Sequence, residues 1–284
     1  MRKWIYFCAI FLFGLSFLYL SPSSKYRYKL AVCAIFKNEA PWLKEWIEYH
    51  RVLGADHFYL YNNDSTDNYS EVLSPYVKEG LVELIDWSSS VEEHKIKENK
   101  GTAHEPYQTA AYNDCLKKKA LGIAKWVAVI DIDEFIVPVH GARSFQSMLN
   151  RMDKQNRGSL KLHWKMFGTS DTWELSPNIP MVQHLTHRAK DDFQENKQVK
   201  SIHRPEAVEF CFIHHAQLKE GFKKKKFDPN EFRVHHYWTR SGKSCAEKRG
   251  LTKENGEEYL NVLNSVEDTT IFQYLPELKT RLQN

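Results

Sequence analysis

WVAVIDIDEFIVP, residues 126–138, is the most informative segment of the chain. Its apolar, β-branched start predicts a strand buried on both faces, and it then meets Asp131, Asp133 and Glu134. On an extended chain Asp131 and Asp133 point to the same side, roughly 6.5 Å apart along the strand. Two such carboxylates repel each other unless a cation lies between them. The pattern predicts a divalent metal site at the carboxyl end of a central strand. A strand that enters an acidic surface turn is the alternative.

Upstream of this segment, strands and helices alternate. Strands are predicted at residues 30–36, 56–62 and 80–87, with a helix at 41–53, another ending near 77, and a third over 107–123. Such alternation predicts a mostly parallel sheet covered by helices, with right-handed crossovers. Polar turns follow the strands, and open α/β sheets bind ligands in the crevice at those ends.

Downstream of residue 138 the pattern changes to α+β. Short strands are predicted at 159–164, 181–185 and 209–214, a helix at 247–263, and a short closing helix within 265–284. The dense basic run at 223–226 predicts a solvated loop, with an anionic ligand or lipid head groups nearby as the alternative.

The composition indicates a folded protein with one substantial core. The chain has 284 residues, of which 42% are hydrophobic and 13% aromatic. Its 40 basic and 36 acidic residues are mixed along the chain, and the net charge is +4. Because no basic stripe stands out, we expect no nucleic-acid partner.

The amino terminus predicts a membrane segment. Residues 4–20 form an uncharged apolar run, which favours an uncleaved anchor over a signal peptide because no typical cleavage site follows. Residues 1–29 would then form the anchor and a short stem. Arg2 and Lys3 favour a cytoplasmic N-terminus, whereas three cations at positions 25, 27 and 29 oppose it.

The five cysteines show no Cys-x-x-Cys spacing, which argues against a zinc ribbon. Cys33 and Cys115 lie in apolar periodic segments and are expected as buried thiols. If a disulfide forms, Cys211 and Cys245 are the expected pair.

Several motifs on both sides of the acidic segment carry a family resemblance. They are KNE at 37–39, YNNDSTD at 61–67, Gln108 with YNDC at 112–115, DIDEF at 131–135, WKMFGTS at 164–170, KSIHRP at 200–205, HH at 214–215 and HHYWTRS at 235–241. In this order and spacing, the chain from about residue 30 to its end resembles glycosyltransferase family 92.

The resemblance implies a fold and an activity. The fold would be of GT-A type, with a mixed central sheet, a nucleotide-binding half at 30–138 and an acceptor-binding, metal-completing half at 139–284. The activity would be inverting transfer of a hexose, often galactose, from a UDP-sugar to a glycan on a protein, lipid or polysaccharide. It would depend on Mn²⁺ or Mg²⁺. The membrane topology would be type II, with the catalytic domain in the Golgi lumen of a eukaryote or in a bacterial envelope.

The resemblance also implies a metal site. Asp133 would bind the metal directly, and Asp131 would contact the ribose or a metal-bound water. An imidazole would complete the site, and His236 is favoured over His235, His214 and His215 because it matches the His-Tyr of the family motif. Oxygen ligands with one imidazole suit manganese.

Further polar residues are expected around the donor. They are Asn38, Glu39, Asp64, Gln108, Asn113, Asp131, Lys200 and Arg204. The two cations would bind the diphosphate. For Asp64 the alternative is an Asx turn before the next helix, for the cations a surface salt bridge, and for the two helical amides simple solvation.

An inverting reaction needs a carboxylate base near the acceptor hydroxyl. Asp171, Glu206 and Glu209 are the candidates. Relatives commonly have Ser-Gly-His where this chain has Ser170-Asp171-Thr172, so this position is a departure from the family pattern. Two rival functions stay open: a glycan-binding or scaffold protein without turnover, and a metal-dependent nucleotidyltransferase or hydrolase.

Overall fold

The structure is a computed structural model that describes residues 25–96, 106–176 and 178–283. The predicted anchor at residues 4–20 lies outside these ranges. Among the residues described, none of the helices combines the length and the hydrophobicity needed to cross a bilayer.

The predicted alternation of strands and helices in the first half is confirmed. The elements are β1 (Tyr28–Phe36), α1 (Ala40–Val52), β2 (His57–Asn62), α2 (Tyr69–Lys78), β3 (Val82–Asp86), α3 (Pro106–Asp114) and β4 (Ala124–Val129). The strand pairs β1–β2, β2–β3 and β1–β4 are all parallel. The carboxyl ends of these four strands therefore meet at one edge of the sheet.

Asp131 and Asp133 do not lie on an extended strand, and this corrects the sequence prediction. β4 ends at Val129, and the chain turns before β5 (Glu134–Pro138), which lies at the far end of the sheet beside β12 (Phe232–His236). The Glu134 carboxylate accepts the Asp131 N–H at 2.9 Å and so stabilises the turn. The two aspartates therefore share one connection, and strand alternation does not determine where they point.

The sheet is mixed and has nine strands. Its order is β3-β2-β1-β4-β8-β6-β12-β5, and β11 (Lys223–Lys226) pairs with β6 (Arg157–Met166). β8 (Val199–His203) runs antiparallel to both neighbours, β4 and β6. One sheet thus runs through both predicted halves, and the predicted class, a mixed central sheet flanked by helices, is confirmed.

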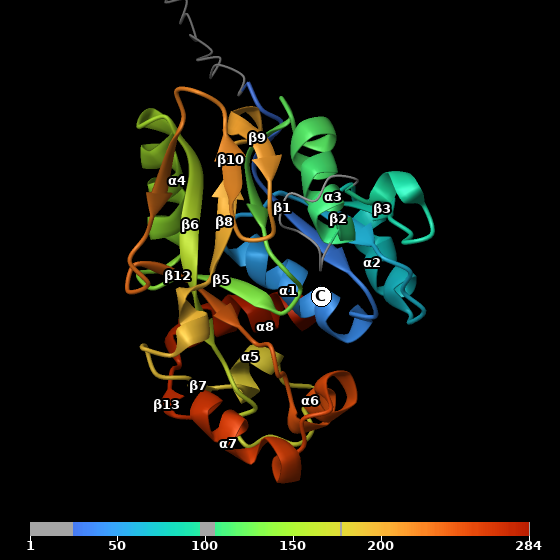
Figure 1. The fold of residues 1–284 in the computed structure, drawn as a ribbon, viewed down its shortest axis with the longest axis vertical. Helices are drawn as coiled ribbons and strands as arrows, with labels where there is room; N and C mark the ends of the chain where they lie inside the picture. Colours follow the sequence, from blue (N-terminus) through green and yellow to red (C-terminus); the bar gives the residue numbers. More distant parts are fainter. Residues whose placement is uncertain (1–24, 97–105, 177, 284) are drawn as a thin grey trace, which may run out of the picture.

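Helices cover both faces of the sheet (Figure 1). α1, α4 (Ala142–Lys154) and α8 (Leu275–Gln283) contribute to one hydrophobic cluster, and α3 contributes to the other. Alternate β1 residues face the two clusters, Val32 the first and Cys33 the second, as expected for a strand buried on both faces.

The second half departs from prediction in three places. In place of the strand predicted at 181–185, the chain forms a short helix, α5 (Met181–His184), whose first two N–H groups donate to the Glu45 carboxylate. The predicted helix at 247–263 is two helices, α6 (Gly242–Arg249) and α7 (Lys253–Leu263), separated at Gly250, whose φ is +67°. The basic run at 223–226 is an exposed strand and not a loop.

The remaining strands are short. They are β7 (His187–Arg188), β9 (Val208–Cys211), β10 (Ala216–Leu218) and β13 (Val266–Glu267). β7, β13, α5, α6 and α7 gather at one end of the molecule, beyond the edge of the large sheet (Figure 1).

The expected Cys211–Cys245 disulfide does not form. Both cysteines are free and buried, as are Cys33 and Cys115. The Cys211 thiol instead donates to the Phe212 carbonyl at 3.3 Å. Burial raises the pKa of Cys211, which keeps this group a thiol.

Candidate active site

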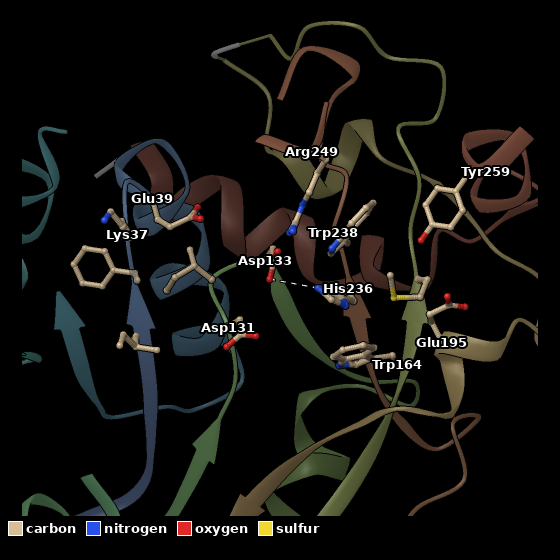
Figure 2. A pocket seen from close by; sticks show the side chains of 14 residues that line it. Lys37, Glu39, Asp131, Asp133, Trp164, Glu195, His236, Trp238, Arg249 and Tyr259 are labelled. Carbon is tan, nitrogen blue, oxygen red and sulfur yellow. Dashed lines mark ion pairs between the residues drawn. The ribbon is translucent and has the colours of Figure 1, made fainter. Parts of the chain in front are cut away.

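A cavity of about 560 Å³ opens at the carboxyl ends of β1 and β4 (Figure 2). Its wall includes the ends of β6 and β12 and parts of α6 and α7. The lining residues are Ile35, Phe36, Lys37, Glu39, Asp131, Ile132, Asp133, Trp164, Met166, Glu195, His236, Trp238, Arg249 and Tyr259. This is the edge of the sheet at which the sequence predicts a ligand, and the volume suits a small molecule.

Protein donors already occupy both carboxylate oxygens of Asp131. Gln108 Nε2 and the Tyr112 hydroxyl donate to Oδ1 at 2.8 and 2.7 Å, and Lys200 Nζ donates to Oδ2 at 2.7 Å. Lys200 Nζ also lies 3.5 Å from Glu134 Oε2. Asp131 is therefore oriented and charge-compensated within the protein, which favours hydrogen bonding to a ligand over direct metal coordination.

Lys200 balances the charges of Asp131 and Glu134 at the base of the cavity. Its side chain is fully buried, and burial alone would lower its pKa. The carboxylates of Asp131 and Glu134 outweigh that effect and raise the pKa of Lys200 above its ordinary value. Burial raises the pKa of Glu134 to about 7, although the charge of Lys200 opposes this.

Asp133 and His236 form a pair that faces the cavity. Asp133 Oδ1 lies 3.5 Å from His236 Nε2, and Figure 2 shows both side chains between the two walls. Burial would raise the pKa of Asp133, but the neighbouring imidazole, Arg240 and Lys200 lower it below its ordinary value. The carboxylate therefore stays ionised.

The Asp133–His236 pair fits a divalent cation. Two adjacent ligands of an octahedral ion are about 3 Å apart, close to the 3.5 Å observed between these atoms. In the described ranges, no three His, Cys, Asp or Glu side chains surround one point. A cation here would take its other ligands from water and a bound phosphate, as Mg²⁺ commonly does.

The structure brings one of the four candidate histidines to Asp133. His236 and His235 alternate along β12, so His235 points away and accepts a hydrogen bond from Arg233 Nε at 2.9 Å. His214 contacts the Val199 carbonyl through Nδ1 at 3.1 Å. His215 stacks on Phe212. Of the four candidates, His236 is therefore the histidine that the structure places beside Asp133.

The two turns expected at the nucleotide hold each other in place. Asn38 Oδ1 accepts the Thr66 N–H at 2.7 Å, and Asp64 Oδ2 accepts the Ser89 N–H at 2.9 Å. Asn38 and Asp64 both adopt positive φ, +56° and +57°. Hydrogen bonds from Ser89 lower the pKa of Asp64 to about 2. Asp64 therefore links two turns and does not cap α2, which has no side-chain cap.

Glu39 lines the cavity but is held by two cations. Arg240 Nη2 lies 2.5 Å from one of its oxygens and Lys248 Nζ lies 2.8 Å from the other. These contacts tie the turn after β1 to the segment between β12 and α6, through Arg240, and to α6 itself, through Lys248.

Arg204 and Asn113 lie away from the cavity. β8 runs antiparallel to β4, with Ser201 beside Val129 and His203 beside Val127, so Lys200 reaches the acidic turn while Arg204 lies toward the opposite end. Arg204 pairs with Glu206 and with Asp153. Asn113 is buried, and its side chain bonds the backbone of Cys211 and so joins α3 to β9.

None of the three residues expected as the base lines this cavity. Asp171 lies at a second cavity beside Trp173, where Asn264 Nδ2 is 3.5 Å from its Oδ1. Glu206 accepts hydrogen bonds from Arg204 and Tyr26. Glu209 is exposed on β9 and accepts from Gln217 at 2.7 Å.

Sequence reasoning missed Glu195, Arg249 and Tyr259. They come from a 3₁₀ turn (Gln194–Lys197), the last residue of α6 and the middle of α7. Arg249 stacks over the Trp238 ring, with its guanidinium carbon 4.4 Å from the centroid. No local pattern marks these positions because only tertiary packing brings the three segments together.

Acidic side chains at the strand ends, facing cations and aromatic rings across a cavity, define an α/β protein with a polar binding crevice at the edge of its sheet. The sequence model of glycosyltransferase family 92 matches residues 28–282, and the chain belongs to this family.

Relatives of this chain include named galactosyltransferases. A β-1,4-galactosyltransferase from Caenorhabditis elegans is 26% identical over 85% of this chain and 55% of its own length. A family 92 protein from Ricinus communis is 26% identical over 74% of this chain and 35% of its own length. The chain thus spans between about one third and just over one half of these two relatives. A galactan β-1,4-galactosyltransferase from Arabidopsis thaliana is 29% identical over 50% of this chain and 26% of its own length.

Remote likeness to solved structures also exists. Staphylococcus aureus TarS in complex with UDP-GlcNAc is 12% identical, with a TM-score of 0.42, and the match covers 89% of this chain and 72% of that structure. A Mycobacterium tuberculosis glucosyl-3-phosphoglycerate synthase is 13% identical, with a TM-score of 0.35, over 64% of this chain and 58% of that structure. The family assignment rests on the family model.

Proposed function

We propose that this chain is an inverting glycosyltransferase that moves a hexose, galactose first among the candidates, from a UDP-sugar to a glycan acceptor with the help of Mn²⁺ or Mg²⁺. The observation that carries the proposal is the Asp133–His236 pair, which faces the same cavity as two cations and four aromatic rings. The relatives named as β-1,4-galactosyltransferases support galactose as the sugar.

The divalent cation would be held by Asp133 and His236. When bound, it stabilises negative charge on the departing diphosphate. Lys37 and Arg249 line the same cavity, and within the described residues no carboxylate forms an ion pair with either. Both cations are therefore available to bind the diphosphate, a role that the sequence prediction gave to Lys200 and Arg204.

The aromatic residues supply apolar walls for the rings of the donor and acceptor. Trp164 lies beside His236, with ring centroids 4.3 Å apart, and Trp238 packs against Tyr259 at 5.8 Å. Flat apolar faces with a few convergent polar groups are typical of small-molecule sites. Asp131, held by Lys200, Gln108 and Tyr112, would accept a hydrogen bond from the ribose.

The proposed enzyme is anchored in a membrane. The apolar run at residues 4–20 supports a single membrane anchor with the domain outside the cytoplasm. We place the enzyme in the Golgi lumen if the source is eukaryotic and in the cell envelope if it is bacterial.

The test is a donor and metal screen on the full-length chain in detergent. UDP-galactose, UDP-glucose and UDP-N-acetylglucosamine are each supplied with Mn²⁺, Mg²⁺ or a chelator, and β-1,4-galactan oligosaccharides serve as acceptors. We expect metal-dependent lengthening of the acceptor with UDP-galactose. Glycan binding without sugar transfer would favour the scaffold function, and absence of UDP-sugar binding would contradict the proposal.

A further inference from the structure

Glu195 differs from every other carboxylate that lines the cavity. Arg240 and Lys248 form ion pairs with Glu39, and Lys200 forms an ion pair with Asp131. Asp133 is paired with His236. Within the described residues, Glu195 forms no ion pair, although its side chain lines the same space. It is therefore the lining carboxylate with the most freedom to accept a proton from a bound molecule.

The turn that carries Glu195 is fixed to the sheet. Its neighbour Asn196 is buried, accepts the Met166 N–H at 2.8 Å and donates to the Lys190 carbonyl at 2.8 Å. Met166 is the last residue of β6 and itself lines the cavity. The carboxylate is thus presented from a rigid support, as proton transfer in a defined geometry requires.

Glu195 lies on the wall opposite the nucleotide turns. Figure 2 shows Lys37 and Glu39 on one side of the cavity, Asp133 and His236 between the walls, and Glu195 below Tyr259 on the other side. Glu195 and Tyr259 line the same part of the cavity, and burial together with the charge of Glu195 raises the pKa of the Tyr259 hydroxyl. A donor bound at the nucleotide turns would direct its sugar toward this wall.

We propose that Glu195 is the catalytic base of the transfer, an inference that rests on the proposed function. The acceptor hydroxyl oxygen forms a bond to the anomeric carbon and its proton moves to a Glu195 carboxylate oxygen. The bond from that carbon to the diphosphate oxygen breaks, and its electron pair leaves with UDP. Glu195 later releases the proton to water. A β product from an α-linked UDP-hexose requires this single inversion and therefore one such base.

The test compares Glu195→Gln with wild type in the full-length chain. The amide keeps the shape of the side chain but accepts a proton poorly, so kcat should fall about 10²- to 10⁴-fold. The Kd for UDP with Mn²⁺ and the KM for the acceptor should stay within about threefold. Asp192→Asn, an exposed acid three residues away, is the matched control and should keep wild-type kcat.

Two results would overturn the assignment while the proposed function stands. One is an active wild type whose Glu195→Gln variant keeps kcat within about threefold. The other is a Glu195→Gln variant that raises only the acceptor KM, because that pattern belongs to a binding contact. A wild type that binds UDP and Mn²⁺ but transfers no hexose overturns the proposed function and, with it, the role of Glu195.

Discussion

At the scale of single residues, Asp133 allows a direct test of the metal site. Asp133→Asn removes the negative charge but keeps the size of the side chain. We expect a folded protein that loses Mn²⁺-dependent turnover by at least about 10²-fold, since a neutral amide is a poor ligand for a divalent cation. Titration of Mn²⁺ against the protein with UDP checks the cause, and Glu220→Gln, on an exposed turn, is the control.

Lys200 pairs with two acids of the site, so its loss should destabilise the protein. Lys200→Met leaves Asp131 and Glu134 without their buried cation, and loss of one buried partner costs about 3–5 kcal/mol. At low pH the two acids can bind protons in place of the missing cation. The loss in the free energy of unfolding should therefore be larger at pH 8 than at pH 5. Urea denaturation at both pH values measures it.

The control for Lys200 is an exposed lysine. Lys219 lies on an exposed turn, and Lys219→Met should change the free energy of unfolding by no more than about 0.5 kcal/mol. Equal losses in the two variants would mean that Lys200 does not compensate the acids.

At the scale of elements, the break between α6 and α7 depends on Gly250. Its φ of +67° is in the left-handed region, and a Cβ at this position would meet nothing within 4 Å. The cost of Gly250→Ala is therefore conformational, about 1–2 kcal/mol. Gly250→Asn, which tolerates this conformation better, should lose less. Thermal denaturation that ranks the two variants the other way would refute this account.

Local sequence patterns predict the elements whose determinants are local. β1, α1, β2, α2 and β3 were predicted because hydrophobic period and turn residues agree within each segment. The helix α5 was predicted as a strand because its cap, Glu45, lies more than a hundred residues away. The same limit applies to the turn at Asp131, because Lys200, which pairs with Asp131, is distant in the sequence.

The residues of the candidate site likewise differ in whether the sequence alone could place them. The family resemblance predicts Asp133 and His236 as metal ligands, and the structure places these residues of separate segments 3.5 Å apart. It also favoured Arg204, but the antiparallel direction of β8, which the sequence does not reveal, places that residue toward the other end of the strand. Glu195 carries no motif, and its role depends on which neighbouring acids are paired.

At the scale of the whole molecule, buried titratable groups determine how stability depends on pH. Burial lowers the pKa of His50 and of His203 to about 3, so both are neutral in the folded protein at pH values where the unfolded chain binds protons. Their stabilising effect is present above pH 6.5 and is lost as pH falls toward 3. Burial raises the pKa of Glu45 and Glu134 to about 7. Between pH 7 and 4.5 these two groups therefore increase the free energy of unfolding as the pH falls.

The two effects therefore offset each other above pH 4.5, and below it the histidines act unopposed by these acids. These four groups alone contribute a shallow dependence of the free energy of unfolding between pH 6.5 and 4.5, and below pH 4.5 the two histidines contribute a loss of about 2.7 kcal/mol per pH unit. Urea denaturation across this range measures the slope. His203→Leu removes one proton-binding group and should reduce the slope below pH 4.5 by about 1.4 kcal/mol per pH unit. An unchanged slope in that variant would show that His203 binds its proton in the folded state as well.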